Sequence, residues 1–475
     1  MKTIYQSIPN WEGVAKTELI IAQKHQKNDD VDDAIEAYKQ ALETYRKIDN
    51  PVRVSELLTL LANLEESNTG EKLNRLTDLE ASLEETGNME ELVRVRTEIG
   101  NYYKLQNEVE KARTYYLKAY NTNSRDKSYL AQEAGYFSAL ISSQQERFAA
   151  ANALLNKIAA SSVISRQEEI AAQSYQLLAQ NKSATGQHEE ALSSINQALE
   201  LGVEDLFIPL SLTQTAVLIS NKRYSEALKV IQALQDKALN NRDWLTLYLY
   251  AGKANLGLAR NEQALKMVNA GIGLLQPGQY SDREFELRDL KTLILSTRGD
   301  INNAISNQTQ LIIILQRENI RDRLGEAHLR LAELFIEAGQ LTQAIDTNQA
   351  ASTFITNDRI LNIRMLLNIA KITRIQNKLS RSIGYFNQIN SLLDQSVPKT
   401  LRADIAYQAG FTYLQVSRFD EALGNFRQSE RLFQELNQPD ETLQSRLAQA
   451  NVLMKQGTIK QAERIFQSAL SQSES

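Results

Sequence analysis

Residues 98–120 read EIGNYYKLQNEVEKARTYYLKAY, and this stretch describes two helices joined by a turn. The residues spaced to share one face of the first helix are Ile99, Gly100 and Tyr103. Those that share one face of the second are Ala112, Tyr116 and Ala119. The small residues allow the two backbones to approach each other, and the tyrosines fill the space beside them. The stretch therefore predicts a closely packed helix–turn–helix unit.

This pattern of small and aromatic residues resembles the tetratricopeptide repeat. The same spacing recurs along the chain around a reference residue that we call the anchor. In the full pattern a small residue precedes the anchor by twelve positions, a bulky one follows by four, and a small or apolar one follows by seven. The copies at Leu73, Ala151, Ala304 and Ser382 are weak. The anchors are Ala34, Ala112, Ala151, Ala191, Ala227, Ala264, Ala304, Ala344, Ser382, Ala422 and Ala462. A degenerate copy around Leu73 fills the double-length gap after the first anchor. The period is about 39 residues, against about 34 in the common repeat.

The resemblance implies an all-α fold, a right-handed superhelical solenoid of about twelve antiparallel helix pairs. The chain has 475 residues, of which 42% are hydrophobic, so it can bury a long continuous core. No linker rich in proline, glycine or serine divides the series. We therefore expect one continuous solenoid over residues 14–470, preceded by an extension at 1–13 and followed by a frayed tail at 471–475.

Prolines and glycines give independent support for this register. Proline costs about 3 kcal/mol in a helix interior, and all six prolines fall between pairs or in the first turn of a helix. They are Pro9, Pro51, Pro209, Pro277, Pro398 and Pro439. The glycines that lie five residues before an anchor are Gly186, Gly299, Gly339 and Gly457. A glycine at that point is typical of the end of a helix.

Composition excludes several classes of function. The net charge is −5 and the pI about 5.6, so nucleic acid is not an expected partner. The absence of cysteine excludes disulfides, thiolate zinc sites and cysteine nucleophiles. The N-terminus lacks the apolar segment of a signal peptide. The strongest apolar run, residues 311–315, is far shorter than a membrane span. We expect a cytoplasmic protein with no membrane span and no cofactor.

No catalytic constellation is evident in the sequence. His25, His188 and His328 lie in different predicted pairs, and none has a second ligand at metal-binding spacing. The chain contains neither a phosphate-binding loop nor a nucleophile elbow. The sequence therefore predicts a protein that is not an enzyme.

In tetratricopeptide proteins the first helix of each pair lines a concave groove that receives peptides or helices. In the pair at Ser382, the face turned away from the core carries Arg364, Asn368, Lys371 and Arg374. The equivalent positions on the neighbouring pairs hold Arg330, Tyr407 and Phe411. A basic stripe beside two aromatics suits an acidic or C-terminal peptide segment. The alternative interpretation is a solvated helix face whose aromatics are covered by neighbours.

A weaker candidate lies nearer the N-terminus and consists of Thr97, Asn101, Lys104, Gln176 and Gln180. The lysine and asparagine set of the carboxylate-clamp tetratricopeptide proteins is absent, so binding of chaperone tails is not expected.

Two functions remain open. One is a non-catalytic scaffold that binds protein or peptide partners in the groove. The other is a regulatory sensor of a signalling or transcription system, in which a peptide or small ligand changes the solenoid. Self-association through an exposed end of the solenoid is a further expectation, since a terminal pair has no neighbour to cover its apolar residues.

Overall fold

A computed structural model of the chain describes residues 11–28, 30–64, 70–122, 128–237, 239–275, 282–436 and 438–473. Over these residues it contains twenty-four α-helices and one short 3₁₀ helix, η1 (Glu204–Leu206). None of the described helices combines the length and apolar character needed to cross a membrane. The predictions for Pro9, Pro277, residues 1–10 and residues 474–475 lie outside the described residues.

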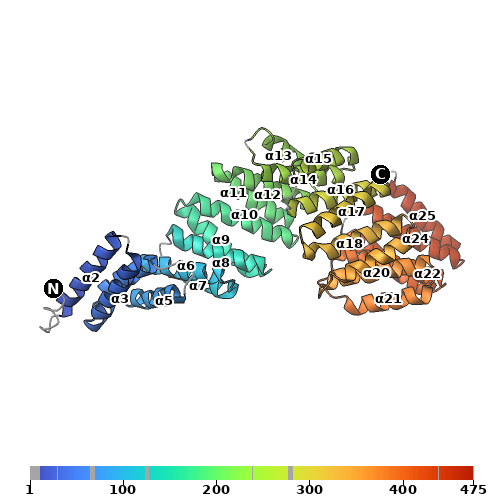
Figure 1. The fold of residues 1–475 in the computed structure, drawn as a ribbon. Coiled ribbons are helices and arrows are strands. Elements are labelled where there is room, and N and C mark those ends of the chain that lie inside the picture. Colours follow the sequence, from blue (N-terminus) through green and yellow to red (C-terminus); the bar gives the residue numbers. More distant parts are fainter. Residues whose placement is uncertain are drawn as a thin grey trace. The chain divides into compact units, whose positions relative to one another are not determined.

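Contacts divide the chain into two compact units, residues 1–243 and 244–475, and each is a succession of antiparallel helix pairs (Figure 1). The pairs of the first unit are α2 (Trp11–Lys27) with α3 (Val31–Lys47), α4 (Pro51–Leu64) with α5 (Gly70–Thr86), α6 (Met89–Leu105) with α7 (Val109–Asn121), α8 (Tyr129–Gln144) with α9 (Phe148–Ile164), α10 (Glu168–Ala184) with α11 (His188–Glu200), and α12 (Phe207–Ser220) with α13 (Tyr224–Leu234).

The second unit contains the remaining pairs, and the division falls in the first turn of its first helix. They are α14 (Asn241–Gly257) with α15 (Asn261–Gly273), α16 (Asp282–Thr297) with α17 (Ile301–Arg317), α18 (Arg321–Glu337) with α19 (Leu341–Ser352), α20 (Arg359–Ile375) with α21 (Leu379–Leu392), α22 (Lys399–Gln415) with α23 (Phe419–Glu435), and α24 (Pro439–Lys455) with α25 (Ile459–Ser473). The predicted all-α solenoid of twelve pairs is thus confirmed for the described residues, whereas its continuity as one body stays a prediction.

The anchors occupy the position that the sequence pattern assigns to them. Each lies in the second helix of its pair, and none is more than 1% exposed. The degenerate copy around Leu73 forms α4 and α5. Since a larger side chain would have no space at a fully buried anchor, the small residue there sets how closely the two helices pack.

A second steric relationship repeats between the residue twelve before the anchor and the residue four after it. A Cβ atom added to Gly100 would lie 2.7 Å from the Tyr116 ring. An added Cβ on Gly410 would lie 2.7 Å from the Phe426 ring. Real Cβ atoms do not approach other atoms so closely. The missing side chain of each glycine is therefore the space that the aromatic ring of the second helix occupies.

The turn inside the pair has the same backbone conformation in ten of the described pairs. In the ten pairs from α6/α7 to α24/α25, the residue five before the anchor has a positive φ. The four predicted glycines are among them, with φ between 72° and 82°. The other six positions hold Asn107, Glu146, Lys222, Ala259, Asn377 and Ser417, with φ between 56° and 60°. This is the left-handed residue that closes a helix, and it is used here whether or not glycine is present.

The described prolines also agree with the predicted register. Pro51 and Pro439 are the first residues of α4 and α24, Pro209 lies in the first turn of α12, and Pro398 immediately precedes α22. The first helix, α2, begins at Trp11, three residues before the predicted start of the solenoid at residue 14.

Candidate functional site

The first helices of four successive pairs in the second unit line a cavity of about 1000 Å³. These helices are α16, α18, α20 and α22, and contacts join α18 to α20 and α20 to α22 (Figure 1). We call this cavity the α16–α22 groove. Of the seven residues in the stronger predicted site, the five that line it are Arg330, Arg364, Asn368, Lys371 and Arg374. The rest of the lining consists of Leu293, Glu333, Ile336, Glu337, Ile360, Leu367, Pro398, Thr400, Leu401, Asp404 and Gln408.

The two arginines at the centre of the groove are each held between carboxylates. The guanidinium of Arg364 lies 3.0 Å from Glu333 and 3.7 Å from Glu326. That of Arg330 lies 3.4 Å from Glu333 and 3.5 Å from Asp289. The shared Glu333 thus joins an arginine of its own helix to an arginine of the next pair. These positive charges are neutralised within the protein before any partner binds.

The other two cations of the stripe have different surroundings. The Lys371 ammonium lies 3.0 Å from the Asp404 carboxylate. The Arg374 guanidinium donates one 3.3 Å hydrogen bond to the neutral Gln408 side chain and lies over the Phe411 ring at 5.7 Å. Among the described residues, no carboxylate lies within ion-pair distance of Arg374. Burial accordingly lowers the pKa of Arg374 below its ordinary value, because the charged form is desolvated.

The remaining three predicted residues are committed to packing. Asn368 is only 1% exposed, and its amide donates to the Leu329 carbonyl oxygen at 3.4 Å and to the Asn348 side chain at 3.3 Å. Tyr407 and Phe411 pack edge-to-face on the buried Phe426 ring. Whether the stripe binds a partner stays a prediction. The stripe lines a groove, and the aromatics beside it are covered by their neighbours.

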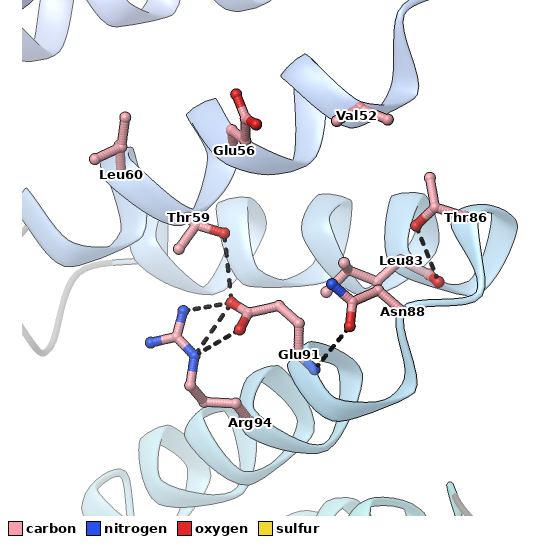
Figure 2. Close-up of a pocket in the computed structure, with 9 residues that line it drawn as sticks. All are labelled: Val52, Glu56, Thr59, Leu60, Leu83, Thr86, Asn88, Glu91 and Arg94. Carbon is pink, nitrogen blue, oxygen red and sulfur yellow. Dashed lines mark hydrogen bonds and ion pairs between the residues drawn. The ribbon is translucent and has the colours of Figure 1, made fainter.

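A second cavity, of about 680 Å³, lies in the first unit between α4, α5 and α6. Figure 2 shows its lining residues, which are Val52, Glu56, Thr59, Leu60, Leu83, Thr86, Asn88, Glu91 and Arg94. The Glu91 carboxylate accepts hydrogen bonds from the Arg94 guanidinium at 3.0 Å and 3.1 Å, while its backbone N–H donates to the Asn88 side chain. The polar part of this cavity is thus already internally satisfied.

Sequence reasoning missed this cavity, although a signal for it was present. Arg94 lies eighteen residues before its anchor, Ala112, and Arg364 lies eighteen before Ser382. The two arginines therefore hold the same register position in different pairs, and each lines a cavity. A comparison of that position across all pairs would have selected Arg94 from the sequence alone.

The weaker predicted set has separate local roles. Thr97 is buried and donates to a carbonyl oxygen of its own helix, and Asn101 accepts a 2.8 Å hydrogen bond from a tyrosine hydroxyl of α7. Lys104 lies 5.5 Å from the centre of a phenylalanine ring of α8. Gln176 donates to a backbone oxygen and a hydroxyl of α12, and Gln180 is exposed on α10. Lys104 and Gln176 therefore contact the next first helix, whereas Thr97 and Asn101 make their contacts within their own pair.

The three histidines lie in three different helix pairs, on α2, α11 and α18. No group of three or more potential metal ligands occurs among the described residues. His25 is partly exposed, with Asp30 and Asp33 at 3.7 Å and 3.9 Å. The His328 ring stacks on Phe354, and burial lowers its pKa. His328 thus acts as an apolar packing residue.

One family model matches part of this chain, and several solved structures are similar to it. Residues 172–201, which span most of α10 and all of α11, match the family model described as Tetratricopeptide repeat. No curated protein sequence matches the chain. Similar solved structures include the APC/C hetero-tetramer Cut9-Hcn1, with 11% identity over 97% of this chain and 98% of that one and a TM-score of 0.41. The structure of yeast Tom70 has 15% identity over 94% of this chain and 96% of that one, with a TM-score of 0.47.

A Rap protein complexed with Competence and Sporulation Factor has 14% identity over 56% of this chain and 75% of that one, with a TM-score of 0.43. The pair α10/α11, which matches the family model, shares its residue pattern with the neighbouring pairs. Its anchor, Ala191, is fully buried, and the same buried small residue at the same spacing recurs in the pairs on both sides. The match to the tetratricopeptide repeat thus covers α10 and α11, and the other described pairs share the register of that pair.

Proposed function

We propose that this protein is a non-catalytic scaffold that binds a peptide or protein segment in the α16–α22 groove. Tetratricopeptide repeats generally bind protein partners. The observation that carries the proposal is the groove itself, because one cavity of about 1000 Å³ draws its lining from four successive first helices. A groove that crosses several helices suits an extended chain better than a compact small molecule.

The lining supports a partner with both apolar and polar groups. Its apolar surface comes from residues of all four helices, including Leu293, Ile336 and Leu401. Most of its charges are already paired, so an acidic partner gains little general electrostatic attraction from the stripe. Affinity would then come chiefly from burial of apolar side chains, with polar groups fixing the register of the partner.

A steric block tests the proposal without disturbing the ion pairs. Thr400 is exposed in the first turn of α22 and lines the groove, so Thr400→Trp fills part of the cavity. Thr342 is exposed on the second helix α19 and does not line it, which makes Thr342→Trp a matched control. We expect affinity capture followed by mass spectrometry to identify a partner lost only from Thr400→Trp. A partner retained by both variants would place binding elsewhere.

The ion pairs of the groove favour a second candidate function, a ligand-responsive regulatory sensor. The ion pairs Arg364–Glu333 and Lys371–Asp404 each join one helix pair to the next along the groove. An occupant that competes for these groups would change the spacing of the pairs, whereas one that leaves them intact would not. Small-angle X-ray scattering of the full chain, with and without the captured partner, separates the two functions. Unchanged dimensions would reject the sensor.

Self-association through the last helix pair stays a proposal of its own. Met454 of α24 and Ile459 of α25 are both more than half exposed. Sedimentation of the full chain, compared with a Met454→Gln and Ile459→Gln double variant, would detect a dimer that depends on this surface. A single monomeric species for both chains would reject it.

A further inference from the structure

Arg374 differs from every other cation that lines the α16–α22 groove. The charged groups of Arg330, Arg364 and Lys371 lie between 3.0 Å and 3.4 Å from their nearest carboxylates. Among the described residues, the polar contact of the Arg374 guanidinium is the 3.3 Å hydrogen bond that it donates to the neutral Gln408 side chain. Its Nε atom, like that of Arg330, is buried and has no hydrogen-bond acceptor among the described residues. The groove thus contains one partly buried positive charge that has no carboxylate within ion-pair distance among the described residues.

This arrangement is unfavourable in the free protein. A guanidinium taken out of water loses hydration that a planar bidentate carboxylate can replace. The Phe411 ring, 5.7 Å away, provides a cation–π contact, and the C-terminal end of α20 provides a partial negative charge. Both are weaker than an ion pair in a partly dehydrated groove. The missing partner is therefore a carboxylate.

The neighbouring carboxylates limit how many negative charges an occupant can carry. Glu333, Glu337 and Asp404 line the same groove and would repel a second acidic group. The position of Arg374 also indicates how the occupant runs. It lies on α20, with lining residues on α16 and α18 to one side and on α22 to the other. A chain that reaches Arg374 can therefore continue in both directions.

We propose that Arg374 binds one acidic side chain, from the interior of an extended peptide segment that lies in the α16–α22 groove. This inference rests on the proposed function and specifies its ligand. Arg330, Arg364 and Lys371 then serve to hold the helix pairs together, and Arg374 determines which peptide is accepted. A terminal carboxylate is the competing source of the same charge.

Peptide selection on the full chain tests the inference. A phage library of random twelve-residue peptides, fused at their C-termini to the coat protein, presents side-chain carboxylates but no free terminal one. We expect the selected peptides to share a single Asp or Glu at a fixed distance from apolar residues. A synthetic, C-terminally amidated copy is then titrated against the wild type, Arg374→Gln and the control Arg381→Gln by fluorescence anisotropy. Arg381 is exposed on α21 and does not line the groove.

Arg374→Gln should weaken binding at least about thirtyfold, since it breaks a desolvated charge pair. Arg381→Gln should leave affinity unchanged. Replacing the acidic peptide residue by its amide should weaken binding to the wild type by a similar factor. The same replacement should change the affinity for Arg374→Gln very little, as expected when the two residues form a coupled pair.

Three results would overturn the inference, and they are distinguishable. Equal binding by the wild type and Arg374→Gln, with loss of binding in Thr400→Trp, would keep the groove as the binding site and remove Arg374 from it. Binders found only in a library with free C-termini would assign the carboxylate to a chain end. No binder in either library would reject peptide binding by the groove, and with it the proposed function.

Discussion

The Arg364 guanidinium and the Glu333 carboxylate lie 3.0 Å apart, although they belong to successive helix pairs. Both side chains are largely shielded, at 19% and 23% exposure. The contact therefore lies in a partly dehydrated seam, where an ion pair is stronger than at an open surface. It holds α20 against α18 at the centre of the groove.

Arg364→Met and Arg374→Met should have opposite effects on stability. The first removes a partner from Glu333 and Glu326 and should lower the free energy of unfolding by about 1–3 kcal/mol. The second removes a charge that has no carboxylate partner among the described residues, so stability should be unchanged or higher. Urea unfolding followed by circular dichroism measures both variants. An equal loss for both would contradict the distinction between the two arginines.

Gly410→Ala should destabilise the second unit, because its new Cβ would lie 2.7 Å from the buried Phe426 ring. The expected loss in unfolding free energy is about 1–3 kcal/mol, as for overpacked cores. Gly424→Ala is the matched control on the next helix, α23, where an added Cβ meets nothing within 4 Å. That change should stabilise by up to about 1 kcal/mol through helix propensity. The two thermal midpoints should therefore shift in opposite directions.

The left-handed turn residues provide a second matched pair. Ala259 has a φ of 56°, which is unfavourable for a residue with a Cβ atom, so Ala259→Gly should raise unfolding free energy by about 1 kcal/mol. Gly339 has a φ of 72° in the equivalent turn, so Gly339→Ala should lower it by about the same amount. Chemical denaturation measures both. A loss of stability in Ala259→Gly would show that backbone strain does not dominate at this turn.

Alkaline pH should destabilise the pair α6/α7 through Tyr116. Its side chain is 1% exposed, its hydroxyl donates to Asn101 at 2.8 Å, and burial raises its pKa to about 12. The folded-state pKa lies above the unfolded value of about 10. The stabilisation is therefore complete below pH 10 and is lost as pH rises toward 12. The total loss in unfolding free energy is on the order of 3 kcal/mol.

Tyr116→Phe removes this titration, and its stability should fall less steeply than that of the wild type over the same pH interval. Urea unfolding at pH 9, 10 and 11 measures the two slopes. Parallel curves would show that the other tyrosines determine the alkaline behaviour.

The repeating pattern could be predicted because it arises from local steric needs. A residue such as Ala422 must be small in order for two helices to touch, and that need repeats in every pair. Where the core departs from this pattern, the sequence offers no signal. Gln308 lies four residues after its anchor, where Phe426 stands in another pair, and it is fully buried. Its amide is satisfied by the Ala327 carbonyl oxygen and the Thr292 hydroxyl, both on other helices.

The candidate site shows the same limit. Spacing along α20 placed Arg364, Lys371 and Arg374 on one stripe, and all three line the groove. The packing between helix pairs sets how α18 and α22 are displaced along α20. That displacement decides which of the three cations lies beside a carboxylate. The absence of a carboxylate beside Arg374, among the described residues of the groove, therefore becomes visible only in three dimensions.

The succession of helix pairs also has a consequence for how the chain folds. Within each unit, the main contacts of the described helices join elements that are adjacent or next but one in the sequence. Each of these contacts therefore closes a short loop at a small entropic cost. The helices of a unit thus form their main contacts with segments that are close to them in the sequence. A chain of this kind is suited to folding during synthesis, one pair after another, as soon as each second helix has left the ribosome.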